Sequence, residues 1–122
     1  MAESLYHLEI ISVGRFVARA LQQQRLILFA DPVPAAIADY CAVHRPGKLS
    51  GALLPGLHIK INESVRQITA VGSVATANLQ RLGHITLSFN GAAEAELPGT
   101  VHLSGPTPAT ILPGDRITIC RR

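Results

Sequence analysis

Short runs in which apolar and polar residues alternate recur along this chain of 122 residues. Successive side chains of a β-strand point to opposite faces, so such runs are typical of strands that bury one face. The pattern predicts strands over residues 5–13, 25–29, 57–61, 65–71, 83–89, 100–104 and 116–120. Polar residues Asn62, Glu63 and Ser64 separate the third run from the fourth, which predicts a hairpin there.

Two short segments favour helix instead. Residues 35–41 combine helix-forming side chains with a preceding proline, which suits a first helical turn. Residues 74–82 carry an apolar stripe at helical spacing, with Ser73 as the expected N-cap and Gly83 as the expected stop. The composition of residues 16–22 is also compatible with a turn or two of helix.

Many short strands with two short helices predict a mainly β fold, a compact barrel that is closed or partly closed. The length fits a single domain spanning residues 1–122. The turn-rich stretch over residues 44–56 contains no run long enough for a regular element and is expected to form surface loops.

Composition narrows the possible functions. The chain is 48% hydrophobic and only 4% aromatic, and no apolar stretch approaches the roughly 20 residues of a membrane span. The N-terminus lacks the pattern of a secretory signal, so we expect a cytoplasmic protein without membrane insertion. Cys41 and Cys120 lie far apart in the sequence and form no Cys-x-x-Cys pair, so we expect both to be free thiols. The net charge of +3 is scattered and few aromatic residues accompany it, so nucleic acid is not an expected partner.

Histidines are the candidates for chemistry. His84 and His102 each lie in a predicted strand and alternate with apolar residues, so we expect both on a polar face and not in the core. Asn90-Gly91 is a turn signal between the two strands, and a hairpin there would bring both imidazoles to one surface.

Familiar catalytic motifs are missing. The five histidines show neither His-x-His nor His-Glu-x-x-His spacing, so no metal site is expected. The sequence also lacks Gly-x-Ser-x-Gly, a phosphate loop and a dinucleotide fingerprint, so no cofactor is expected. Cys41 would lie at the C-terminal end of a helix, which does not favour a thiolate, and fits better as a small buried side chain.

His44 follows the helix predicted over residues 35–41 and is expected to be exposed in a loop. A neutral imidazole nitrogen attacks phosphorus well near neutral pH, and the phosphoramidate that forms is easily passed on. The pattern alone leaves two interpretations open, because an exposed loop histidine is also an ordinary surface residue.

Four segments decide between them by resemblance: residues 40–44 (Tyr-Cys-Ala-Val-His), 69–75, 82–87 and 94–102. Because these four segments occur in this order, the chain resembles the glucitol/sorbitol-specific IIA component of the bacterial phosphoenolpyruvate-dependent sugar phosphotransferase system. The resemblance implies that His44 receives a phosphoryl group from the carrier protein HPr. It implies transfer onward to the IIB component, which phosphorylates the hexitol as the membrane component IIC imports it.

His84 and His102 also match positions of this family. Each is a candidate for orienting His44 or for donating to the phosphoryl oxygens, and the alternative is that each fixes a strand or turn locally. Some members of the family carry further histidines where this chain has Arg45, Pro46 and Leu54. A second function remains open at this stage, a regulatory or binding module that keeps the fold but transfers no phosphoryl group.

Overall fold

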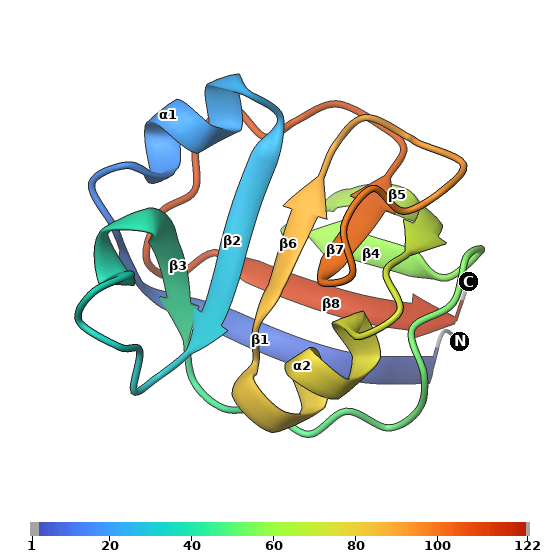
Figure 1. The fold of residues 1–122 in the computed structure, drawn as a ribbon, viewed down its shortest axis with the longest axis horizontal. Helices are drawn as coiled ribbons and strands as arrows, with labels where there is room; N and C mark the ends of the chain where they lie inside the picture. Colours follow the sequence, from blue (N-terminus) through green and yellow to red (C-terminus); the bar gives the residue numbers. More distant parts are fainter. Residues whose placement is uncertain (1–2, 122) are drawn as a thin grey trace.

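The computed structural model describes residues 3–121 and confirms a mainly β fold, a closed barrel with two helices and a 3-10 turn (Figure 1). The strands are β1 (Glu3–Val13), β2 (Arg25–Ala30), β3 (Cys41–His44), β4 (His58–Ile61), β5 (Ser64–Val71), β6 (Ile85–Ser88), β7 (Thr100–Leu103) and β8 (Arg116–Arg121). The helices are α1 (Val17–Gln22) and α2 (Ala75–Leu82), and the 3-10 turn is Ala38–Tyr40.

The barrel closes in the strand order β1-β3-β2-β6-β7-β5-β4-β8. The pairs β2/β3 and β6/β7 are parallel, and the other neighbours are antiparallel. The interior is filled mainly by Leu, Ile and Val side chains, which form one large buried cluster. This aliphatic core follows from the scarcity of aromatic residues in the sequence.

Segments with clear alternation fold as predicted. The hairpin forms between β4 and β5, with Ile61 opposite Ser64 across the turn. α2 ends at Gly83, which adopts the left-handed conformation with φ of 63° that favours glycine at this position. α1 forms within the segment whose composition is compatible with helix.

The helix predicted over residues 35–41 is wrong. Only Ala38–Tyr40 forms a 3-10 turn, and the chain enters β3 at Cys41. β3 lies between β1 and β2 and is buried on both faces, because Ala42 belongs to the barrel core while Cys41 and Val43 pack with Phe29 in a second cluster outside it. A strand buried on both faces has no polar alternation by which it could be distinguished from a helix.

Two turn predictions are also wrong. Asn90-Gly91 does not join a hairpin, because β6 and β7 run parallel and the segment between them returns the chain to the starting end. Ser73 does not cap α2, whose N-cap is Val74 with no side-chain cap hydrogen bond.

One end of the barrel carries the features that matter for the site. α2 lies at the end where β2 and β3 finish and β6 begins (Figure 1). Within residues 3–121, neither helix is long and apolar enough to cross a membrane.

Candidate functional site

His44 is the last residue of β3, where it pairs with Ile10 of β1 and Ala30 of β2. Its side chain is on the same strand face as Ala42, which points into the barrel core. The residue is 0% exposed. The expectation of an exposed loop histidine is therefore wrong, because β3 continues through His44 and the irregular chain begins only afterwards.

Both ring nitrogens of His44 face backbone carbonyls. Nδ1 lies 2.8 Å from the carbonyl oxygen of Arg45, and Nε2 lies 2.8 Å from that of Gly83. A neutral imidazole has one N–H, so it donates to only one of these oxygens and presents a lone pair toward the other. One hydrogen bond to a carbonyl orients the ring, which lies between the end of β3 and the end of α2.

A pocket of about 370 Å³ is lined by residues that contact this ring, although His44 itself is not part of its wall. Its wall is formed by Tyr6 of β1, residues 29–32 at the end of β2, Pro46 and Gly47 in the loop after His44, and residues 79–83 at the end of α2. Gly83 thus contributes to the pocket wall and contacts Nε2 of His44 through its carbonyl. Of the two ring nitrogens, Nε2 is the one whose partner lines the pocket.

The charges near the pocket are mixed. Arg81, in the last turn of α2, and Asp31 both line it. Arg45 and Lys48 are exposed on the loop that follows His44. These guanidinium and ammonium groups suit an incoming phosphoryl group, which carries negative charge on its oxygens.

His84 lies next to this pocket. Its ring stacks on that of Phe29, with the centroids 4.7 Å apart and the planes 27° from parallel. Phe29 lines the pocket, and His84 directly follows Gly83 in the chain. Desolvation by burial lowers the pKa of His84, which favours the neutral imidazole.

His102 lies elsewhere in the barrel and is 0% exposed, so the expectation that it is not a core residue is wrong. It pairs with Ser88, four residues or about 13 Å of extended chain beyond His84. The Glu96 amide donates to its Nε2 over 3.2 Å, so Nδ1 carries the proton and donates to Asn90 Oδ1 over 2.8 Å. Both nitrogens are used within the segment that joins β6 to β7.

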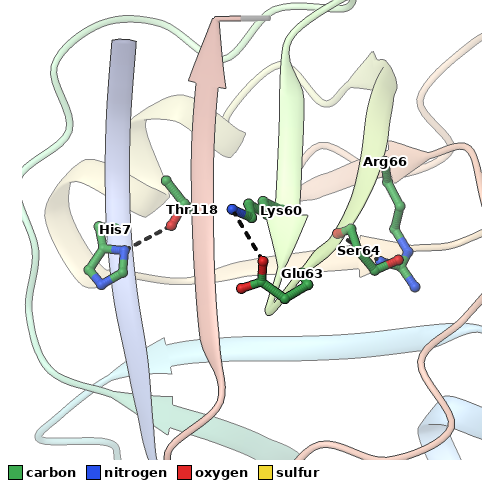
Figure 2. Close-up of polar contacts among 6 residues, drawn as sticks. All are labelled: His7, Lys60, Glu63, Ser64, Arg66 and Thr118. Atoms are coloured by element: carbon green, nitrogen blue, oxygen red, sulfur yellow. Dashed lines mark hydrogen bonds and ion pairs between the residues drawn. The ribbon is translucent and has the colours of Figure 1, made fainter. Parts of the chain in front are cut away.

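The two remaining histidines that the structure describes are separate from this end of the barrel. His7 lies on the outer face of β1 and its Nδ1 is 2.8 Å from the hydroxyl of Thr118 on β8 (Figure 2). His58 begins β4, opposite Cys120 of β8. Within residues 3–121 no group of three or more His, Cys, Asp or Glu residues is arranged to hold a metal ion.

Tyr6 is a pocket residue that the sequence did not indicate as part of the site. It is 2% exposed, and its ring meets that of His44 edge to face with centroids 6.2 Å apart. A tyrosine placed on the inner face of a strand is a possible signal, because its hydroxyl normally requires a partner when it is buried. Only the fold reveals that it lies beside His44.

Comparisons with known proteins identify the family of this chain. The family described as "PTS system glucitol/sorbitol-specific IIA component" matches residues 5–118. The chain is 47% identical over 110 residues to the "PTS system glucitol/sorbitol-specific EIIA component" of Escherichia coli (strain K12) and to that of Shigella flexneri, covering 90% of this chain and 89% of each relative.

A solved structure is similar as well. The PTS system IIA component from Enterococcus faecalis V583 superposes with a TM-score of 0.77 at 25% identity, covering 91% of this chain and 96% of that one. The resemblance seen in the sequence is thereby confirmed. The chain belongs to the glucitol/sorbitol-specific IIA components of the sugar phosphotransferase system, and it is a phosphoryl carrier of that system.

Proposed function

We propose that His44 carries the phosphoryl group and that its Nε2 forms the bond to phosphorus. The donor in this proposal is the phosphohistidine of HPr, and the acceptor is the IIB component that serves hexitol uptake through the membrane component. The observation that carries the proposal is the contact of Nε2 with Gly83, whose backbone forms part of the pocket wall. The other nitrogen is held by the carbonyl of its own neighbour, Arg45.

The two carbonyl contacts suit this division of roles. With the proton on Nδ1 and donated to the Arg45 carbonyl, Nε2 presents a lone pair. Attack requires phosphorus to replace the Gly83 carbonyl in front of this lone pair. The N–P bond of the donor then breaks as the N–P bond to His44 forms, and the Nδ1 proton stays in its hydrogen bond.

Transfer between two histidines exchanges one phosphoramidate for another, so it is nearly balanced in free energy. The tasks left to the protein are alignment, stabilisation of the phosphoryl oxygens and protection from water. The burial of His44 supports protection. Arg81 on the pocket wall, with Arg45 and Lys48 on the adjacent loop, supports attraction of the phosphoryl group.

His84 and His102 have different roles in this proposal. His84 is a positioning residue, because its stacking on Phe29 fixes the wall that includes Gly83. His102 acts locally, because Asn90 and Glu96 occupy both of its nitrogens. No cofactor takes part in this chemistry.

Labelling tests the assignment. Incubation with phosphoenolpyruvate, the general phosphotransfer enzyme and HPr is expected to place an acid-labile phosphoryl group on the wild type and on His7→Ala, but not on His44→Ala. His7→Ala is the matched control because His7 lies on the outer barrel surface. Labelling that persists in His44→Ala would overturn the assignment, and an unlabelled wild type would favour a module without transfer activity.

Two further measurements test which nitrogen of His44 carries the phosphoryl group and whether His84 positions the site. Nitrogen-15 spectra of the phosphorylated protein are expected to show phosphorus on Nε2, and coupling to Nδ1 instead would refute that choice of nitrogen. His84→Gln is expected to slow labelling while the circular dichroism spectrum stays that of the wild type. An unchanged rate in His84→Gln would remove the positioning role.

A further inference from the structure

Among the described residues 3–121 the Tyr6 hydroxyl is the one buried side-chain nitrogen or oxygen without a hydrogen bond of good geometry. The Gly47 backbone N–H approaches its oxygen as a weak donor, and the hydroxyl proton itself has no acceptor. Buried polar groups are nearly always hydrogen-bonded, because an unpaired one loses its contacts with water and gains nothing in return. A phenylalanine would fill the same space without this cost, so the hydroxyl calls for an explanation.

The backbone of β1 places this hydroxyl at the site. The pairing of β1 with β8 shifts register between Ser4 and Tyr6, a bulge that leaves Leu5 as the extra residue. Tyr6 consequently faces the same way as Leu8, into the barrel, and reaches the end where the pocket lies. Its ring plane is 89° from that of His44.

The loop after His44 encloses the hydroxyl on its other side. A Cβ built on Gly47 would lie 2.9 Å from Cζ of Tyr6 and 3.1 Å from its hydroxyl oxygen. Gly47 therefore packs against the hydroxyl end of the Tyr6 ring, and both residues line the pocket, while the His44 ring contacts that of Tyr6 edge to face. Burial raises the pKa of the Tyr6 hydroxyl, against a smaller lowering by a hydrogen bond from the Gly47 backbone to its oxygen, so the group keeps its proton and can act as a donor.

We propose that the Tyr6 hydroxyl donates a hydrogen bond to the phosphoryl group as it is transferred to and from His44. The proposal rests on His44 being the carrier. The bond to the donor histidine breaks and the bond to Nε2 of His44 forms, while negative charge is spread over the phosphoryl oxygens. Tyr6 keeps its proton throughout and supplies the free donor that these oxygens require.

A neutral donor suits a carrier that must release its load. A hydrogen bond from a phenol stabilises the phosphoryl oxygens without the strong ionic attraction of a guanidinium. The hydroxyl is already in place before the phosphoryl group arrives, so little reorganisation accompanies transfer. Tyr6 thereby becomes a catalytic residue, one that contacts the transferred group directly.

The test compares Tyr6→Phe with Tyr40→Phe, since the chain has two tyrosines and Tyr40 is 51% exposed. Transfer from phosphorylated HPr is followed by rapid quench over a range of HPr concentrations. Tyr6→Phe is expected to lower the maximal rate roughly 10- to 100-fold with little change in the half-saturating concentration, as loss of one preorganised donor does. Tyr40→Phe is expected to match the wild type.

The outcomes separate the two proposals. Equal maximal rates for Tyr6→Phe and wild type would overturn the role of Tyr6 and leave His44 as the carrier, provided that His44→Ala stays unlabelled. A labelled His44→Ala would instead remove the carrier assignment itself. A change in half-saturating concentration alone would show that Tyr6 acts in docking and would also overturn the proposal.

A measurement on the wild type avoids any folding defect of a variant. Protein labelled with carbon-13 at the tyrosine ζ position gives two resonances, one from each tyrosine. Phosphorylation of His44 is expected to move the Tyr6 resonance, because its hydroxyl gains an acceptor, and to leave that of Tyr40 in place. A Tyr6 resonance that does not move would overturn the proposal.

Discussion

Removal of the Tyr6 hydroxyl is expected to stabilise the unphosphorylated protein. In the unfolded chain the hydroxyl proton is hydrogen-bonded to water, whereas in the folded chain it is buried without an acceptor. Such a group costs about 1–3 kcal/mol relative to its solvated state. Tyr6→Phe removes this cost and forfeits the dispersion contacts of one oxygen atom, a few tenths of a kcal/mol. The expected net gain in the free energy of unfolding is about 1 kcal/mol.

Urea denaturation followed by far-ultraviolet circular dichroism measures this gain, since the chain has no tryptophan to report by fluorescence. With an m-value of about 2 kcal/mol/M, the midpoint should rise by roughly 0.5 M at an unchanged m-value. Tyr40→Phe, at an exposed position, is expected to stay within about 0.5 kcal/mol of the wild type.

A loss of about 1 kcal/mol in Tyr6→Phe would refute the reasoning. It would show that the hydroxyl is well hydrogen-bonded in the folded state, through the Gly47 backbone N–H whose contact already lowers its pKa. A change in m-value would point instead to an altered extent of unfolding.

Three further predictions concern neighbouring residues. Gly83→Ala is expected to lose about 2–5 kcal/mol in urea denaturation, because a side chain is strained at its φ of +63° and the new Cβ would lie 2.4 Å from that of Ala30. His102→Ala is expected to lose about 2–4 kcal/mol and to raise hydrogen exchange in residues 90–99, since Asn90 loses its partner, while the transfer rate stays near that of the wild type. For His84, burial lowers the folded-state pKa, so the unfolded chain binds more protons once the pH falls below about 6.5 and stability declines there. His84→Gln should flatten this decline when urea midpoints near pH 7.5 and pH 5.5 are compared, and an equal decline in both proteins would contradict it.

The sequence pattern predicts those strands that have one buried face and one exposed face. β4, β5 and β8 alternate because one face packs in the barrel and the other meets solvent, and their boundaries follow the pattern closely. β3 has no such alternation, because the second cluster around Phe29 covers its outer face, and the pattern therefore does not predict it as a strand. The turn signal Asn90-Gly91 is a real turn, with φ of 64° at Gly91, but a local signal cannot specify that the strands on either side run parallel.

The candidate site is predictable only in part for a similar reason. Resemblance identifies His44, but its burial depends on β3 being flanked by β1 and β2 over its whole length. The polar-face argument groups His84 with His102, whereas only His84 lies near the pocket. Tyr6 lies near the N-terminus and Gly83 in the second half of the sequence, and the barrel brings both to the His44 ring.

Two neighbouring side chains at the candidate site, Tyr6 and His44, have incomplete hydrogen bonding. The Tyr6 hydroxyl is a donor without an acceptor, and the neutral His44 ring has one proton for two carbonyl acceptors. A phosphoryl group on Nε2, as proposed, would give the Tyr6 hydroxyl an acceptor and would replace the contact between the ring lone pair and the Gly83 carbonyl. Incomplete hydrogen bonding lowers the free energy of unfolding of the unphosphorylated protein. Proteins retain such destabilising groups mainly at functional sites. If His44 is the carrier, as we propose, the Tyr6 donor is in place before the phosphoryl group arrives, which is what preorganisation of a transfer site requires.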